Sequence, residues 1–420
     1  MNESGKKKIF IKGPSKLKGK VNISGSKNAV LPILAATLIT DKKCIIRNVP
    51  DLTDISIMIE MLRVLGKKVK RNGMVVKVEY SGRLGGEAPY DLVKKLRASV
   101  LVMGGLAGRR NDIKVALPGG CAIGTRPVDL HLKGFQTMGA SIDVSEGFIN
   151  INTKGLQGKT VYLDYPSVGA SENLIIAGCR AKGETIIENT AREPEVLQLV
   201  EFLKQAGAEI KVKDNTVRIK GKNEFNSVDF KVMDDRIQAG TYILAGCINS
   251  SELIIEFSHP KVIESTIEKV IECGAKTSID SKNIEIKGPS KLKSTDIRTS
   301  PYPGFPTDLQ APFTSLLATA KGVSVITEEI FENRFLHCPE LRRMGADIEI
   351  KGSSAIITGV KKMTGAPVMA RDLRGGAALI IAGLLSNGVT EISGIHHIER
   401  GYEDIVGKLQ KLGADIWIEQ

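Results

Sequence analysis

One cysteine lies in a loop whose composition suits acid–base chemistry. Cys121 belongs to the segment PGGCAIGTRP (118–127), whose glycines allow the backbone to approach a ligand closely. A thiol beside Arg126 and other cations would have a lowered pKa and would exchange protons near neutral pH. The alternative is an incidental loop cysteine. No histidine stands at a spacing typical of a cysteine protease, so a loop that closes over bound substrate is the better interpretation.

A proline-rich turn brings one carboxylate to the start of an apolar, helix-like run. The segment RTSPYPGFPTD (298–308) ends at Asp308. Asp308 is either a helix cap or a general base held among cations. In the second case its surroundings would lower its pKa and keep it ionised at neutral pH.

Polar residues recur at the starts of several other apolar runs that are typical of buried helices. A helix N-terminus presents unsatisfied N–H groups and partial positive charge, which suits phosphate. The residues at these starts are Lys27 with Asn28, Arg97, Ser167 with Val168 and Gly169, Arg236, Asp308, and Arg374. Caps and solvated charges are the alternative, but basic residues at four matching starts favour an anion-binding site.

Arginines also recur in the segments that follow predicted strands. These segments are LPGGCAIGTRPVDLH (117–131), AREPEV (191–196), IFENRFLHCPE (330–340) and HHIERGYED (396–404). Arg binds carboxylate or phosphate through a bidentate fork. A substrate that carries both groups would explain several of these arginines.

The elements that must position these residues form an internal repeat. A helix end, a glycine and an alternating strand pair recur every 67–73 residues, at Gly66, Gly139, Gly207, Gly274, Gly345 and Gly413. Each glycine fits a helix C-cap in the left-handed conformation. The alternation that follows predicts a hairpin with one buried face.

A second block falls between these glycines. It is an Ala/Gly/Leu-rich helix followed by a β-rich run, as in SVGASENLIIAGCRAKGETIIENT (167–190). A helix that is apolar on all sides is buried. The sequence therefore predicts an α/β fold in which each repeat contains a buried helix, a strand, an amphipathic helix and a strand pair. Six repeats allow one closed ring or two globules of three. Two globules with helices inside and sheets outside are the economical packing, with a ligand cleft between them.

Composition limits the partners and the cell compartment that we expect for this protein. The chain has 420 residues and a formal charge of +12, which suits an anionic partner. Its basic residues are dispersed and no stacking motif occurs, so we expect no nucleic acid. No apolar run reaches the ~20 residues of a membrane helix, and no apolar segment follows the basic N-terminus. We expect a cytoplasmic protein with no membrane partner. No Cys pair has zinc-site spacing, and Cys44, Cys179 and Cys247 fit buried positions.

Several long motifs resemble one family. SGSKNA, the PGGCAIGTRPVDLH loop, NTAREPE, PGFPTDLQA, FENRF, the DLR at 372–374 and HIERGYE are similar to the UDP-N-acetylglucosamine 1-carboxyvinyltransferases, a family of enolpyruvyl transferases. The match runs in order from about residue 8 to the C-terminus. The resemblance implies two inside-out α/β barrel domains, each of three βαβαββ-like repeats, with a cleft between them. The first would be an inserted domain at 27–234, and the second would combine 1–26 with 235–420.

The resemblance also implies a set of site residues. Cys121, Asp308 and Lys27 would be catalytic. Lys27 and Asn28 would bind phosphoenolpyruvate, and Arg126, Arg374 and Arg400 would hold its phosphate and carboxylate. Arg334 would lie close to the reacting centre. The residues expected to contact UDP-N-acetylglucosamine are Arg97, Arg126, Pro127, Val128, Asp129, Leu130, Ser167, Val168, Gly169, Asp308 and Ile330. Where some members carry a basic residue before the Ser-Val-Gly segment, this chain has Tyr165, so no salt bridge to the nucleotide is expected there.

The implied reaction is the first committed step of peptidoglycan precursor synthesis. Cys121 would protonate the methylene carbon of phosphoenolpyruvate, and the sugar 3′-hydroxyl would attack while Asp308 accepts its proton. Loss of phosphate from the tetrahedral adduct would leave the enol ether. No metal or organic cofactor is expected, since Arg and Lys would stabilise the charge.

Three other functions compete with this one. The first is enolpyruvyl transfer to shikimate 3-phosphate, against which the Cys121 loop argues. The second is a noncatalytic UDP-sugar-binding paralogue, against which Cys121, Asp308, Lys27 and Arg400 argue together. The third is a nucleic-acid-binding repeat protein, which a salt-dependent gel shift would detect.

Overall fold

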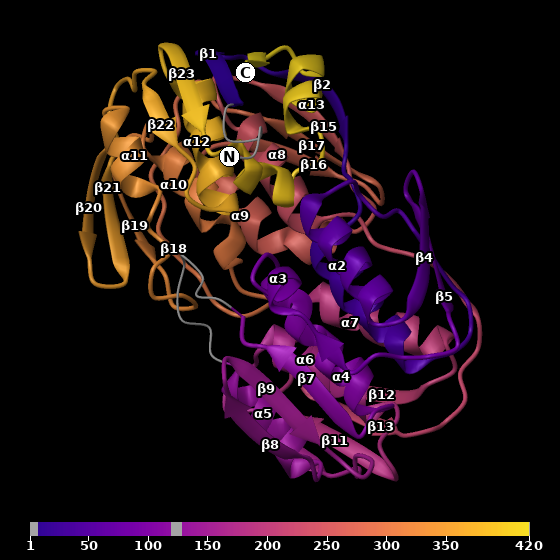
Figure 1. The fold of residues 1–420 in the computed structure, drawn as a ribbon. Coiled ribbons are helices and arrows are strands. Elements are labelled where there is room, and N and C mark those ends of the chain that lie inside the picture. Colours follow the sequence, from indigo (N-terminus) through magenta and orange to yellow (C-terminus); the bar gives the residue numbers. More distant parts are fainter. Residues whose placement is uncertain (1–6, 119–127, 420) are drawn as a thin grey trace. The chain divides into compact units, whose positions relative to one another are not determined.

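The computed structural model describes residues 7–118 and 128–419 of the chain (Figure 1). These residues form two compact units. Unit 1 contains residues 7–24 and 234–419, and unit 2 contains residues 25–118 and 128–233. The sequence predictions for Cys121, Arg126 and Pro127 lie outside the described residues.

All sheets in the described part of the chain have four strands with the same pairing pattern. In the order across the sheet, the first strand is parallel to the second, the second is antiparallel to the third, and the third is antiparallel to the fourth. In most sheets a buried helix connects the first two strands, and an amphipathic helix leads from the second strand to the fourth. The third and fourth strands form the hairpin that the alternating sequence predicts, except in the sheet where the N-terminal strand of the chain pairs with the C-terminal one.

Unit 2 holds three of these sheets. In sheet order, their strands are β14 (Val228–Lys231), β3 (Cys44–Arg47), β5 (Val75–Tyr80) and β4 (Lys67–Asn72); β6 (Glu87–Ala88), β7 (Asp112–Ala116), β9 (Phe148–Asn152) and β8 (Ser141–Ser145); and β10 (Thr160–Tyr162), β11 (Glu184–Glu188), β13 (Thr216–Lys220) and β12 (Glu209–Lys213).

Unit 1 holds the other three sheets. Their strands are β2 (Lys18–Asn22), β15 (Glu252–Glu256), β17 (Asn283–Lys287) and β16 (Lys276–Ile279); β18 (Ile297–Arg298), β19 (Val323–Thr327), β21 (Ser354–Thr358) and β20 (Asp347–Lys351); and β22 (Pro367–Met369), β23 (Gly388–Ser393), β1 (Lys8–Gly13) and β24 (Asp415–Glu419). The N-terminal strand β1 thus completes a sheet with the last strand of the chain, with Ile11 opposite Ile416.

The centre of each unit consists of the predicted buried helices. They are α1 (Lys27–Ala36) with the short 3-10 helix η2 (Thr37–Ile39), η3 (Arg97–Leu101) with α4 (Val102–Ala107), and α6 (Val168–Gly178) in unit 2, and α8 (Arg236–Gly246), η5 (Thr307–Leu309) with α10 (Gln310–Leu317), and α12 (Leu373–Leu385) in unit 1. Every residue of α8 and α10 is buried. Small residues allow close packing: a Cβ at Gly104 would lie 2.3 Å from the backbone oxygen of Asn173.

The amphipathic helices also occur as predicted. They are α2 (Thr53–Val64), α5 (Asp129–Thr137), α7 (Pro194–Gln205), α9 (Glu264–Glu272), α11 (Cys338–Arg343) and α13 (Ile405–Lys411). All six glycines that end them have φ between 91° and 96°, which confirms the predicted left-handed caps. The remaining helical turns are α3 (Tyr90–Val93), η4 (Pro260–Ile263) and η6 (Ile395–Arg400).

The first strand of each sheet belongs to the βαβαββ-like repeat that the resemblance implies, but the hydrophobic pattern alone does not reveal it. These strands are two to five residues long, and β6 and β18 have only two residues each. A run this short cannot show the alternation that identifies a half-buried strand. The repeat inferred from the pattern alone therefore lacked one strand, whereas the βαβαββ-like repeat is confirmed.

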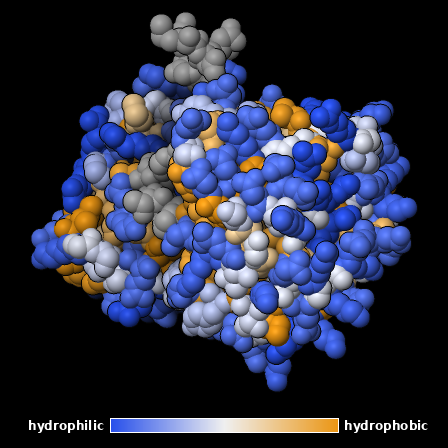
Figure 2. All heavy atoms as spheres, turned by 60° about the horizontal axis from the view of Figure 1, so that its bottom comes forward, coloured by the Kyte–Doolittle hydropathy of each residue, from blue (hydrophilic) through white to orange (hydrophobic). Residues whose placement is uncertain are grey.

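The face of the molecule in Figure 2 is mostly polar, and the described cysteines are buried. The face drawn in Figure 2 is mostly hydrophilic, with hydrophobic residues in small groups. Cys44, Cys179 and Cys247 are buried free thiols, as predicted, and so are Cys273 and Cys338. Within the described ranges, no helix combines the length and the apolar character that crossing a membrane requires.

Candidate active site

The starts of the buried helices fall where the sequence predicts them. Lys27 begins α1, Arg97 begins η3, and Arg236 begins α8. Ser167 is the N-cap of α6, and its hydroxyl accepts a hydrogen bond from Ala170 N at 3.3 Å. These starts place the predicted cations and cap residues at the positive ends of helix dipoles.

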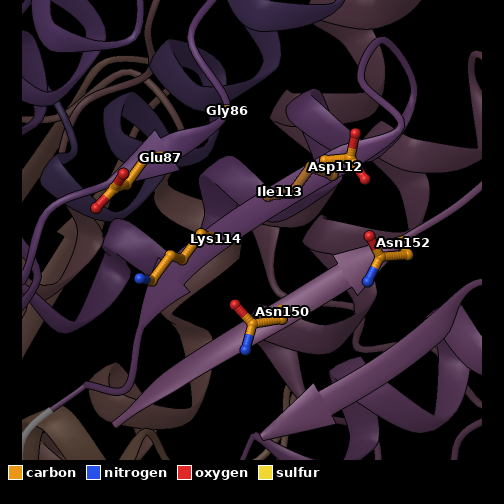
Figure 3. A pocket seen from close by; sticks show the side chains of 7 residues that line it. All are labelled: Gly86, Glu87, Asp112, Ile113, Lys114, Asn150 and Asn152. Carbon is orange, nitrogen blue, oxygen red and sulfur yellow. The ribbon is translucent and has the colours of Figure 1, made fainter. Parts of the chain in front are cut away.

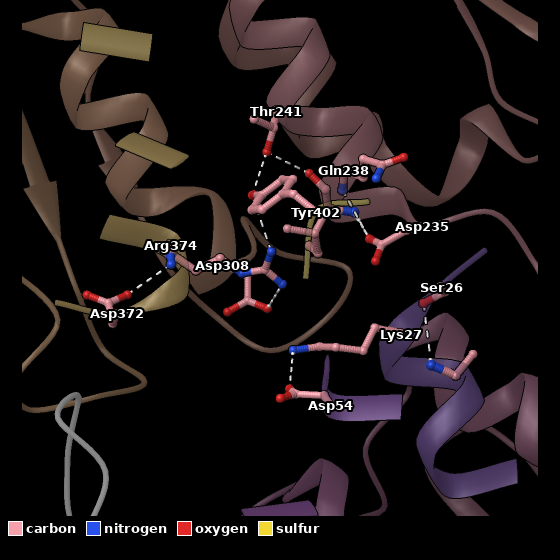
Figure 4. A network of polar contacts seen from close by, with 12 residues as sticks. Ser26, Lys27, Asp54, Asp235, Gln238, Thr241, Asp308, Asp372, Arg374 and Tyr402 are labelled. Carbon is pink, nitrogen blue, oxygen red and sulfur yellow. Dashed lines mark hydrogen bonds and ion pairs between the residues drawn. The ribbon is translucent and has the colours of Figure 1, made fainter. Parts of the chain in front are cut away.

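Asp308 is held by two arginines within unit 1. Its Oδ1 atom accepts a hydrogen bond from Arg334 Nη2 at 2.6 Å. Its Oδ2 atom accepts one from Arg374 Nη2 at 2.8 Å, and Figure 4 shows this second contact. The arginine side chains are 3% and 6% exposed, whereas that of Asp308 is 24% exposed. Pro306 occupies the N-cap of η5, so Asp308 lies within the first turn rather than at the cap. This carboxylate is fixed by its partners and still reaches solvent.

Arg374 is oriented by the start of its own helix. Asp372 is the N-cap of α12, and its Oδ1 atom accepts hydrogen bonds from the backbone N–H groups of Arg374 and Gly375 at 2.9 and 3.0 Å. The cap fixes the backbone from which the guanidinium extends. The side chain of Arg374 then reaches Asp308 and Tyr402, as Figure 4 shows.

Tyr402 links two of the buried helices in unit 1. Its hydroxyl accepts a hydrogen bond from Arg374 Nη1 at 3.2 Å and lies 2.9 Å from Thr241 Oγ1 in α8. Burial alone would lower the pKa of Arg374, but the nearby carboxylate of Asp308 outweighs it and raises that pKa above its ordinary value. Arg374 is therefore a permanent buried cation beside Asp308.

Glu328, which the sequence did not single out, accepts hydrogen bonds from both Ile330 and Thr307. Glu328 is 3% exposed and follows β19 directly. Its Oε1 atom accepts from Thr299 Oγ1 at 3.0 Å and from the backbone N–H groups of Ile330 and Phe331 at 2.9 and 3.2 Å. Its Oε2 atom accepts from Thr307 Oγ1 at 2.9 Å. Glu328 thus connects the turn that carries Ile330 with the residue before Asp308.

Arg400 lies elsewhere in unit 1, at the end of η6. Burial, His396 and Arg400 together lower the pKa of the neighbouring His397. Arg400 therefore places a positive charge at the end of η6, two residues before Tyr402.

Lys27 forms a buried ion pair in unit 2. Its Nζ atom lies 3.0 Å from Asp54 Oδ2, with side-chain exposures of 11% and 2% (Figure 4). Asp54 comes from the first turn of α2, and the sequence analysis did not identify it. Asn28 follows Lys27 in α1, whose N-cap is Ser26. A buried ammonium needs such a partner, because an uncompensated charge there would be expensive.

The other predicted residues of unit 2 lie at three helix starts. Arg97 begins η3, Val128 is the N-cap of α5 with Asp129 and Leu130 in its first turn, and Ser167 precedes Val168 and Gly169 in α6. Tyr165, the departure from the family pattern, is 42% exposed. A connection among these three starts is described below.

A groove of about 390 Å³ lies on a different surface of unit 2 (Figure 3). Its lining residues come from β6, β7 and β9 and the residue before β6: Gly86, Glu87, Asp112, Ile113, Lys114, Asn150 and Asn152. None of the predicted substrate-binding residues lines it, so we assign it no part in the site. Among the described residues, no group of three His, Cys, Asp or Glu side chains is arranged to hold a metal ion.

Known proteins resemble this chain over nearly its full length. A family model described as EPSP synthase (3-phosphoshikimate 1-carboxyvinyltransferase) matches residues 11–409. The chain is 46% identical to UDP-N-acetylglucosamine 1-carboxyvinyltransferase 1 of Caldanaerobacter subterraneus, over 98% of this chain and 99% of the relative. The chain belongs to the UDP-N-acetylglucosamine 1-carboxyvinyltransferase family. UDP-N-acetylglucosamine 1-carboxyvinyltransferase 2 of Carboxydothermus hydrogenoformans is 50% identical, over 97% of this chain and 98% of the relative. The resemblance drawn from the motifs is confirmed.

Solved structures confirm the predicted fold of this family member. The enolpyruvyl transferase NikO from Streptomyces tendae is similar with a TM-score of 0.89 and 24% identity, over 99% of both chains. An EPSP synthase from Acinetobacter baumannii has a TM-score of 0.76 and 18% identity, over 98% of this chain and all of that one. At these identities the likeness concerns the fold alone. The predicted α/β fold of inside-out barrels, with helices at the centre of each unit, is correct.

Proposed function

We propose that this protein transfers the carboxyvinyl group of phosphoenolpyruvate to the 3′-hydroxyl of UDP-N-acetylglucosamine and releases phosphate. The proposal rests on relatives of that name that are 46% and 50% identical to this chain over nearly its full length. The Asp308–Arg334–Arg374 cluster supports it, because it combines a fixed carboxylate with two cations suited to anionic substrates. The formal charge of +12 also fits anionic small molecules as the partners rather than nucleic acid.

The residues we assign to phosphoenolpyruvate are cationic. Lys27, with Asn28, would bind the donor from the start of α1, and Asp54 would hold the Lys27 ammonium in place. Arg374 and Arg400 would hold its phosphate and carboxylate together with Arg126, which lies outside the described residues. A helix start adds backbone N–H groups that favour the same charge.

The residues we assign to the acceptor lie at helix starts and turns. In unit 2 they are Arg97, Val128, Asp129, Leu130, Ser167, Val168 and Gly169, and in unit 1 they are Asp308 and Ile330. Arg126 and Pro127, outside the described residues, complete this set. We propose that the two domains of the enzyme, 27–234 and 1–26 with 235–420, correspond to the two units.

The reaction proceeds by addition and elimination. The Cys121 thiol gives its proton to the methylene carbon of phosphoenolpyruvate, and the central carbon becomes cationic. The acceptor oxygen forms a bond to that carbon as its proton passes to Asp308. The carbon–oxygen bond to phosphate then breaks, and the Cys121 thiolate takes back a proton from the new methyl group, which restores the double bond. Arg334 and Arg374, held by Asp308, stabilise charge without a metal or an organic cofactor.

Enolpyruvyl transfer to 3-phosphoshikimate is the alternative activity, and the matching family model carries that name. The relatives at 46–50% identity favour the nucleotide sugar as acceptor. We also propose that the protein acts in the cytoplasm. The described cysteines are free thiols, which fits a reducing compartment.

A phosphate-release assay with two acceptors tests the proposal. Purified protein is expected to release phosphate from phosphoenolpyruvate when UDP-N-acetylglucosamine is present, and not when either substrate is omitted. Release with shikimate 3-phosphate in its place would support the alternative activity. Binding of UDP-N-acetylglucosamine without any phosphate release would instead support the noncatalytic paralogue.

A further inference from the structure

One buried amide connects the three helix starts of unit 2. Asn173, in α6, is completely buried. Its Oδ1 atom accepts a hydrogen bond from Gly104 N at 2.6 Å, and its Nδ2 atom donates to Val100 O at 3.0 Å. The same Nδ2 atom lies 2.9 Å from Nδ1 of His131, in α5. Both donor hydrogens of the amide are therefore used, and the amide reaches η3, α4 and α5 from α6.

These contacts assign the tautomer of His131. Nδ1 must accept the hydrogen bond from the amide, because the Asn173 Oδ1 atom already faces Gly104 N. The ring proton of a neutral imidazole then lies on Nε2. Burial and the charge of Arg97 lower the pKa of His131 to about 4, so the ring is neutral at physiological pH.

The edge of His131 that carries Nε2 faces the start of α6. A Cβ placed on Gly169 would lie 3.3 Å from Cε1 and 3.4 Å from Nε2 of His131. The ring thus packs against Gly169, the last residue of the Ser167–Val168–Gly169 segment. His131 directly follows Leu130 in the chain. Arg97, whose charge helps to lower the pKa of His131, begins η3.

A completely buried polar residue such as Asn173 needs an explanation. Asn173 is the sixth residue of α6 and ends a run of three buried polar residues, Ser171, Glu172 and Asn173, in a helix whose other residues are apolar or glycine. The sixth residue of α8 in unit 1 is Thr241, which bonds to Tyr402 and through it to Arg374. The same position of the repeat thus carries a polar link to site residues in both units. An apolar side chain there would avoid the desolvation of a buried amide.

We propose that Asn173 and His131 are positioning residues that hold Arg97, the 128–130 turn and the 167–169 helix start in register as one binding surface for the nucleotide sugar. The inference rests on the proposed function, since that function assigns these three segments to UDP-N-acetylglucosamine. Neither side chain takes part in the chemistry. Their effect is on acceptor binding, and phosphoenolpyruvate binding is left largely unchanged.

Asn173→Asp tests the pair with minimal change of shape. A carboxylate still accepts from Gly104 N but has no hydrogen for Val100 O or for His131 Nδ1. We expect the KM and Kd for UDP-N-acetylglucosamine to rise at least about tenfold, with the KM for phosphoenolpyruvate within about twofold of wild type. The control is Asn72→Asp, which adds the same charge at an exposed position of β4 and should change neither constant. Equal losses for both substrates would overturn the proposal, because they would indicate general damage.

Imidazole NMR gives a second readout that does not depend on enzyme activity. The His131 resonances, assigned by their loss in His131→Gln, should show the Nε2–H tautomer and no protonation down to about pH 5. In Asn173→Asp the ring should become protonated near neutral pH. A wild-type Nδ1–H tautomer, or a wild-type ring that titrates at its ordinary pKa, would overturn the pairing. These spectra do not depend on turnover, so failure of the proposed activity remains distinguishable.

Discussion

The variant Asp308→Asn is expected to lower kcat by about 100- to 10,000-fold, the range for loss of a general acid or base. The amide has nearly the same shape as the carboxylate and keeps one oxygen for Arg334 or Arg374. It cannot accept the proton of the acceptor hydroxyl at neutral pH. The KM values should change much less than kcat, because the arginines and the turn remain. Steady-state phosphate release at saturating substrate measures the effect.

Asp229→Asn is the matched control for that experiment. Asp229 also accepts two hydrogen bonds from one arginine, Arg47, at 2.6 and 2.7 Å, but the pair is about half exposed and lies on β14 and β3. Its loss should leave kcat at the wild-type value and change stability little, because solvent screens an exposed ion pair. If Asp308→Asn were as active as the control, Asp308 would not be the base.

Arg374→Met is expected to reduce both stability and donor binding. The substitution leaves the Asp308 carboxylate with Arg334 alone and removes the donor to the Tyr402 hydroxyl. Breaking a buried ion pair from one side typically costs about 3 kcal/mol or more. The free energy of unfolding from denaturant titration should fall by about that amount. The KM for phosphoenolpyruvate should rise while the Kd for UDP-N-acetylglucosamine changes little.

A double-mutant cycle separates the pair from its surroundings. The double variant Arg374→Met with Asp308→Asn should lose less stability than the sum of the losses in the two single variants. Each single variant leaves the other charge without its partner, whereas the double variant removes both charges. Arg374→Lys should keep the charge but lose the fork that reaches both Asp308 and Tyr402, and should fall between wild type and Arg374→Met. Additive effects in the cycle would contradict a direct energetic link between Arg374 and Asp308.

Much of the fold follows from local patterns in the sequence. The six caps from Gly66 to Gly413 require a left-handed residue, which glycine adopts without strain. The buried helices lack any polar face, and their starts at Lys27, Arg97 and Arg374 are marked by the change from polar to apolar residues. Patterns of this kind lie within one helix or hairpin, so they can be recognised in a single chain.

The partners of the site residues could not be predicted in the same way. Asp54 is 27 residues from Lys27, and Arg374 is 66 residues from Asp308. Asn173 and His131 are 42 residues apart, and Asn173 follows Ser171 and Glu172 within α6, so nothing local marks it as the partner of His131. Which distant side chains meet depends on how the repeats pack, and the periodicity does not specify that packing. The two-residue strands β6 and β18 could be expected only from the βαβαββ-like repeat of the family, because runs this short carry no pattern of their own.

The course of the carbon–oxygen bond tests the central claim most directly. Phosphoenolpyruvate labelled with heavy oxygen at the bridging position can be incubated with the protein and UDP-N-acetylglucosamine, and both products analysed by mass spectrometry. We predict that the label leaves with phosphate and that the nucleotide sugar gains an unlabelled carboxyvinyl group. Label retained in pyruvate, with the nucleotide sugar unchanged or phosphorylated, would contradict carboxyvinyl transfer.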